Sequence, residues 1–77
     1  MAAFDQQRWA SSVAAVQEFA GDAWKGEAQD AWAAAAAALD LDAPKTVVVL
    51  AAGDGLFGAC VAHRMGSGGR VALFEAA

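Results

Sequence analysis

The sequence has one cysteine, one histidine and few basic side chains. Its single cysteine, Cys60, cannot form an internal disulfide, and no cysteine–histidine spacing typical of a metal site occurs. Only five lysines and arginines stand against nine acids, and the net charge is −4. This balance argues against binding a nucleic-acid backbone or an anionic membrane surface, because both need clustered basic side chains.

A long apolar segment is also missing. Asp54 interrupts the longest candidate, which therefore falls short of the roughly 18 residues that a membrane span needs. The N-terminus has no basic region followed by an apolar core, so no secretory signal is visible. We therefore expect a soluble, cytoplasmic protein.

Alanine dominates what is present. It supplies 23 of the 77 residues, a length that allows one small domain, and it buries little area per residue. The large apolar anchors are few, and we expect Trp9, Trp24 and Trp32 to pack in the core rather than to form a substrate-binding box. The charge is uneven, because residues 1–43 carry seven acids and two bases, whereas residues 44–77 carry two acids and three bases.

The first half of the chain predicts two helices. Residues 5–20 are amphipathic, with Asp5 as the expected N-cap and Gly21 at the end. The residues on the expected buried face are Trp9, Val13, Val16 and Ala20. Residues 22–26 indicate a break before a second helix over residues 27–39, where Glu27 and Asp30 suit the positive end of the helix dipole.

The second half predicts a strand–helix–strand unit. Residues 40–45 form a linker in which Pro44 disfavours helix. A β-branched strand, a glycine turn, a helix, a glycine-rich break and a second strand follow, at Thr46–Ala52, Gly53–Gly55, Leu56–Met65, 66–69 and Arg70–Glu75. The predicted fold class is α/β: a helical lead-in, residues 1–43, and the first βαβ unit of a Rossmann-like parallel sheet, residues 44–77, an incomplete domain.

The turn between the first strand and its helix has the residues of a nucleotide-type cofactor site. Glycine permits positive φ and close approach of a ligand, and a helix N-terminus offers unpaired N–H groups. Glu75 lies at the end of the second strand, 22 residues after Gly53. A carboxylate at that place accepts hydrogen bonds from both hydroxyl groups of a ribose, although an ordinary solvated acid also explains it.

Two registers of the turn are possible. Gly53–Gly58 matches G-x-G-x-x-G, the pattern of enzymes that bind NAD(P) or FAD, but Ala51 and Ala52 separate it from the strand. The second register begins at Ala51 and reads A-A-G-D-G against G-x-G-x-G. It keeps the turn directly at the end of the strand.

In the second register, the segment Val47–Glu75, 29 of the 77 residues, resembles class I S-adenosylmethionine-dependent methyltransferases. It is most similar to the protein-isoaspartate methyltransferase type. There a helix ending near Ala-His is followed by a Gly-x-Gly-Gly-Arg-Val turn and a strand that closes with Glu. This chain has Ala62–His63, then GSGGRV from Gly66, and Glu75, with no gap needed between loop and acid.

The resemblance implies that Gly53 and Gly55 line the methionine and ribose part of S-adenosylmethionine and that Glu75 holds the ribose hydroxyls. Ala51 stands where the family has its first loop glycine, and Val49 where the family usually has an acid. Asp54 belongs to the same loop, although capping of the helix also explains its position. The later strands that carry substrate and catalytic residues in the family are absent, so the chain identifies no catalytic residue.

The sequence thus predicts an N-terminal fragment of a methyltransferase that supplies the adenosyl-binding loop. Two alternatives stay open: a fragment of an NAD(P)- or FAD-binding oxidoreductase, and a non-catalytic helical interaction module with a degenerate Rossmann half. Two parallel strands leave unpaired edges, so we expect either the rest of a parent domain or self-association through those edges. Cys60 is expected as a small buried residue, and His63 as a favourable charge near a helix C-terminus.

Overall fold

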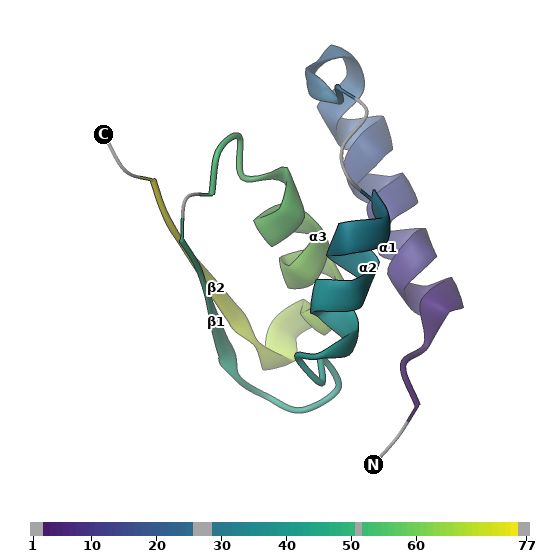
Figure 1. Cartoon of the computed structure of the whole chain (residues 1–77), viewed down its shortest axis with the longest axis vertical. Coiled ribbons are helices and arrows are strands. Elements are labelled where there is room, and N and C mark those ends of the chain that lie inside the picture. Colours follow the sequence, from purple (N-terminus) through teal and green to yellow (C-terminus); the bar gives the residue numbers. More distant parts are fainter. Residues whose placement is uncertain (1–2, 26–28, 51, 76–77) are drawn as a thin grey trace.

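The computed structural model describes residues 3–25, 29–50 and 52–75, which form a mixture of helices and a parallel strand pair (Figure 1). The elements in chain order are α1 (Gln6–Ala20), η1 (Gly21–Ala23), α2 (Gln29–Ala37), β1 (Thr46–Leu50), α3 (Leu56–Met65), η2 (Gly66–Gly68) and β2 (Arg70–Phe74). The predicted combination of N-terminal helices and a strand–helix–strand unit is confirmed at this level.

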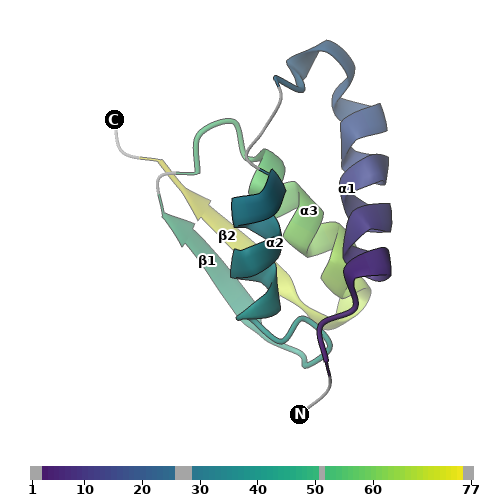
Figure 2. The same ribbon diagram turned by 45° about the vertical axis from the view of Figure 1, so that its right-hand side comes forward.

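The two strands form one parallel sheet that is covered on one side. Thr46 pairs with Arg70 and Leu50 with Phe74. The ladder is extended at its far end by the N–H of Ala52, which donates to the carbonyl of Phe74 at 3.1 Å. All three helices lie on the same side of this sheet, with α2 and α3 next to it and α1 outermost (Figures 1 and 2).

Helix α1 begins and ends as the sequence predicts. The Asp5 carboxylate accepts the N–H of Arg8 at 3.0 Å, and Gly21, at φ +54°, donates its N–H to the carbonyl of Gln17. The predicted apolar face is buried at Trp9, Val13 and Val16, and Ser12 is buried beside it.

The second helix and the two strands are shorter than predicted. Helix α2 ends at Ala37 rather than Leu39, because the N–H groups of Ala38 and Leu39 bond three residues back and Asp40 then turns to φ +50°. Lys45 donates to the carbonyl of Leu39 and so satisfies the end of that turn. Strand β1 ends at Leu50 and β2 at Phe74. The predicted break, second helix and first strand also include residues 26–28 and 51, which lie outside the described part of the chain.

The core lies between α1, α3 and the sheet. Cys60 and Val61 of α3 are fully buried. The other members of the buried cluster are Trp9, Val13, Val16, Ala36, Leu41 and Val47, which come from both halves of the chain. Burial raises the pKa of the Cys60 thiol to about 11, so this residue packs as a small uncharged group, as predicted.

A chain of aromatic contacts joins the three helices. Phe57 in the first turn of α3 lies 6.1 Å from Trp9 of α1 and 5.5 Å from Trp32 of α2, measured between ring centroids. Trp32 in turn meets Trp24 edge-on at 5.8 Å, and Phe4 lies 6.5 Å from Trp9. All three tryptophans therefore pack against other aromatic rings, and Trp9 is buried.

One carboxylate ties the linker to two helices. Asp42 Oδ1 accepts hydrogen bonds from the guanidinium groups of Arg64 at 2.6 Å and Arg8 at 3.2 Å. Arg64 is buried, and its Nε has no hydrogen-bond partner among the described residues. The hydrogen bond from Arg64, with the charges of both arginines, holds the pKa of Asp42 below its ordinary value.

Replacing Val61 by alanine tests the core. We expect Val61→Ala to lower the free energy of unfolding by about 2 kcal/mol, because it removes two buried methyl groups and leaves a cavity. Val48→Ala removes the same atoms from a side chain that is 54% exposed and serves as the matched control. Urea unfolding followed by circular dichroism should show less than half the effect for the control, and equal effects would contradict the assigned core.

Replacing Asp42 by asparagine tests the carboxylate between the arginines. Because the folded-state pKa of Asp42 is lowered from 3.8, its stabilisation is present above about pH 4 and is lost as the pH falls through the lowered value. The melting temperature of Asp42→Asn should therefore lie below that of the wild type at pH 6, and the difference should shrink towards pH 2. A difference that does not change with pH would show that the charge of Asp42 is not involved.

Candidate functional site

The glycine turn between β1 and α3 is built from residues in the left-handed region. Gly53 has φ +60° and Gly55 has φ +79°, conformations that residues with a side chain rarely adopt. The N–H of Gly55 donates to the carbonyl of Ala52 at 3.0 Å and closes the turn. The backbone conformation therefore favours glycine at both positions, and neither position carries a Cβ.

Asp54 caps the start of α3. Its Oδ1 accepts the N–H of Leu56 at 3.1 Å, from an exposed position one residue before the N-cap. The carboxylate thus satisfies one of the N–H groups that a helix start leaves without a partner. The same carboxylate also lines a pocket beside the turn.

Glu75 lies across the turn from Gly53. The N–H of Gly53 donates a hydrogen bond to Glu75 Oε2, which joins residues 22 positions apart in the sequence. Glu75 is exposed at the carboxyl end of β2, next to the carboxyl end of β1. A carboxylate accepts several hydrogen bonds through two oxygens, so the bond to Gly53 leaves capacity for hydroxyl groups of a ligand.

The start of α3 lies close against β2. A side chain at Gly58 would overlap Leu73 and approach Val71 Cγ1 to 3.5 Å, and one at Gly55 would come within 3.2 Å of Leu73 Cδ1. Gly58 therefore has a packing role, because it lets the helix approach the strand. This close approach fixes the distance between the turn and the end of β2.

A pocket of about 260 Å³ opens beside the turn, between α2 and the end of β1. Its lining is apolar apart from one carboxylate, and the lining residues are Ala31, Trp32, Ala35, Val49, Ala52, Asp54 and Phe57. Gly53, Gly55 and Glu75 do not line it, and Ala51 lies outside the described residues. The predicted site residues thus lie in two places. Gly53 and Glu75 are joined by a hydrogen bond, and Asp54 lines the apolar pocket.

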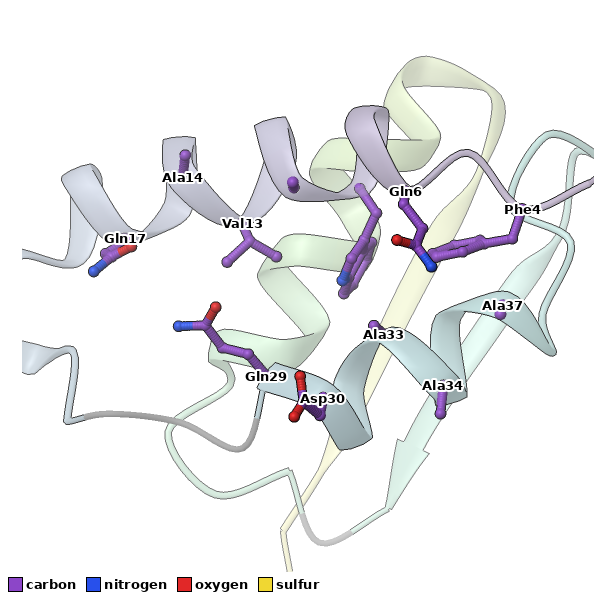
Figure 3. Close-up of a pocket in the computed structure, with 12 residues that line it drawn as sticks. Phe4, Gln6, Val13, Ala14, Gln17, Gln29, Asp30, Ala33, Ala34 and Ala37 are labelled. Atoms are coloured by element: carbon purple, nitrogen blue, oxygen red, sulfur yellow. The ribbon is translucent and has the colours of Figure 1, made fainter.

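A larger groove of about 590 Å³ separates α1 from α2 and contains none of the glycine-turn residues (Figure 3). Val13 and Gln29 point into it from opposite helices, and Ala33, Ala34 and Ala37 lie along the α2 side. The sequence analysis did not identify this groove. The sequence feature that could have indicated this groove is the run of alanines at 33–38, because their small side chains leave the space between the helices open.

Ser12 and His63 form a polar contact between α1 and α3. Ser12 Oγ lies 2.9 Å from His63 Nδ1, and the two residues are 51 positions apart. His63 is in the last turn of α3, the place expected for a favourable charge. In the described ranges no group of three or more histidine, cysteine or acidic side chains is arranged to hold a metal ion. None of the helices described is long and apolar enough to cross a membrane.

Comparison with known proteins adds no relative. No protein-family model, no curated protein and no solved structure matches this chain.

Replacing Glu75 tests the hydrogen bond that closes the turn. We expect the amide of Gly53 to exchange with solvent about 5- to 10-fold faster in Glu75→Ala, because one hydrogen bond contributes about 1 kcal/mol. Glu75→Gln keeps an acceptor oxygen and is the matched control, with a smaller change. The measurement is the exchange rate of the Gly53 amide, followed by NMR in the wild type and both variants. Identical rates in all three proteins would show that Glu75 does not hold the turn.

Proposed function

We propose that this chain supplies the adenosyl-binding part of an S-adenosylmethionine site in a Rossmann-like methyltransferase domain. The observation that carries the proposal is the pairing of Gly53 with Glu75. A glycine turn with positive φ leaves one parallel strand, and an acid ends the neighbouring strand within hydrogen-bond reach of it. The carboxyl end of a parallel sheet is where α/β proteins bind such ligands.

The chemistry of each part fits a portion of this cofactor. Glu75 has the charge and the position to accept hydrogen bonds from the two ribose hydroxyls. Gly53 and Gly55 let the ligand approach the backbone. The pocket lined by Trp32, Phe57 and Val49 is apolar and suits the cofactor's carbon-rich parts. When bound, S-adenosylmethionine would supply an activated methyl group.

The charge of the site also favours a sulfonium ligand. Asp54 and Glu75 are both acidic, and none of the residues lining the pocket beside the turn is basic. S-adenosylmethionine carries a positive sulfonium, which two nearby carboxylates attract. The pyrophosphate of a dinucleotide is anionic and would face the same carboxylates without a basic side chain from the pocket.

We assign no catalytic residue to this chain. Methyl transfer needs groups that orient the nucleophile toward the methyl carbon. In the proposed function these groups come from other parts of a methyltransferase domain. The described residues provide binding and orientation of the adenosyl part alone.

A dinucleotide-binding oxidoreductase is the second candidate, and the packing of Gly58 favours it. The third glycine of G-x-G-x-x-G permits close packing of helix on strand, which is the role that Gly58 has against Leu73. Ala51 and Ala52 separate the first glycine of the turn from Leu50, and this position, with the acidic surroundings, opposes the assignment.

Calorimetric titration of the chain separates these candidates. We expect weak but measurable binding of S-adenosylhomocysteine and S-adenosylmethionine, and no binding of NADH or FAD. Glu75→Ala should weaken adenosyl binding by about 10- to 100-fold, because it removes hydrogen bonds to a charged acceptor. Gly53→Val should abolish it, because valine is strained at φ +60°.

Phe19→Ser, on α1 and away from the turn, is the control and should leave affinity unchanged. Absence of heat with both adenosyl ligands would contradict the proposal. Binding of NADH or FAD instead would establish the second candidate.

A further inference from the structure

A polar pocket of about 430 Å³ lies between α1 and the last turn of α3. Its basic and hydroxyl-bearing lining residues are Arg8, Ser11 and Ser12 from α1 and His63 and Arg64 from α3. In Figure 2 the end of α3 lies beside the first turns of α1, and the glycine turn lies at the opposite end of α3. The pocket is therefore separate from the proposed cofactor site.

Arg64 is buried with much of its hydrogen-bonding capacity unused. The residue is 8% exposed, and its Nε has no hydrogen-bond partner among the described residues. Within the same residues its side chain donates one hydrogen bond, from Nη2 to Asp42 Oδ1 at 2.6 Å, although a guanidinium has five N–H donors. Buried donors are normally paired, so an unpaired one calls for an acceptor from outside the chain. Because Arg64 lines the pocket, we look for that acceptor there.

Other side chains add donors around the same space. Arg8 gives one hydrogen bond to Asp42 at 3.2 Å, and its side chain is 59% exposed, so its remaining N–H groups are accessible to a ligand. His63 meets Ser12 Oγ through Nδ1 at 2.9 Å, a contact that leaves the Nε2 atom of the ring for another partner. The lining therefore combines two guanidinium groups, an imidazole and hydroxyl groups from two different helices.

Two carboxylates lie near the arginines and limit the affinity for an anion without using up the donors. Asp42 takes one donor from each guanidinium, and Asp5, which also lines the pocket, accepts the backbone N–H of Arg8. Most of the guanidinium N–H groups thus stay available, while the formal charges of the two arginines are balanced. A ligand that gains from this arrangement has several acceptor oxygens in a small volume, which favours a phosphoryl group with three over a carboxylate with two.

From these donors we propose that the pocket between α1 and α3 binds a phosphoryl oxyanion, as free phosphate or as the phosphate of a small phosphomonoester. Arg8 and Arg64 supply the charge-assisted hydrogen bonds, and Ser12 with His63 forms the polar wall between the two helices. This inference goes beyond the proposed cofactor site and does not depend on it, because the two sites share no residue.

NMR titration of the whole chain with inorganic phosphate, at pH 7 and constant ionic strength, is the test. We expect a Kd of about 1 mM, with the largest shifts at the Nε–H of Arg64 and the amides of Ser12 and His63. Arg8→Gln should weaken binding about 10-fold, because it removes a charged donor from an exposed side chain. Arg70→Gln is the matched control, since it makes the same change at an exposed arginine outside the pocket, and it should bind phosphate like the wild type.

Asp42→Asn tests the site in the opposite direction. It removes a negative charge from between the two guanidinium groups and keeps an acceptor oxygen, so phosphate should bind about 3- to 10-fold tighter. A purely structural role of the two arginines predicts no such gain. Circular dichroism verifies that each variant is folded.

A parallel titration with phenyl phosphate distinguishes the sources of the oxyanion. Tighter binding of phenyl phosphate than of inorganic phosphate would identify a phosphomonoester as the ligand, and equal affinity would identify free phosphate. Absence of shifts at about 20 mM of both ligands would overturn the proposal, because that concentration is well above the expected Kd. Equal weakening by Arg8→Gln and Arg70→Gln would also overturn it, since it would show that phosphate responds to the net charge of the chain alone.

Discussion

The packing of Phe57 between Trp9 and Trp32 is the contact on which the other features depend. Phe57 belongs to the first turn of α3, so its ring fixes the start of that helix against α1 and α2 at once. An aromatic pair contributes about 0.5–1.5 kcal/mol beyond the area it buries. A chain of this length has only a few kcal/mol of net stability, and two such pairs are a large part of it. Only Leu56 separates the glycine turn from Phe57, so the same contact also restrains the turn.

The turn is constrained from two further sides. Asp54 satisfies the N–H of Leu56 at the helix start, and Glu75 accepts the N–H of Gly53 from the end of β2. Gly58 lets α3 lie against Leu73, which sets the separation between the helix start and that strand. The result is a turn whose backbone conformation is fixed by its neighbours. In the proposed function, this preorganisation would reduce the free-energy cost of ordering the site on binding.

The features that could be predicted from the sequence are those with local signals. Asp5 as a cap, the spacing of Trp9, Val13 and Val16, and the glycines of the turn depend on residues within a few positions of one another, and all are present. The end of α2 was predicted two residues too late, because propensity cannot show that the last turn tightens before Asp40. The contacts of Ser12 with His63 and of Asp42 with Arg64 were missed, since they join residues 51 and 22 positions apart. The first needs the packing of α1 on α3, and the second needs the packing of the linker before β1 on α3. The groove between α1 and α2 was missed for the same reason. The family resemblance and the function drawn from it stay predictions.

In the proposed function the ligand site is the carboxyl end of the sheet and not the groove between α1 and α2. Mapping of backbone amide shifts by NMR during titration with S-adenosylhomocysteine tests it most directly. The account predicts that the largest changes fall on Gly53, Gly55 and Glu75, with smaller ones at Phe57. Changes centred on Gln6, Gln17 and Gln29 in the helical groove, or no changes at millimolar ligand, would contradict it.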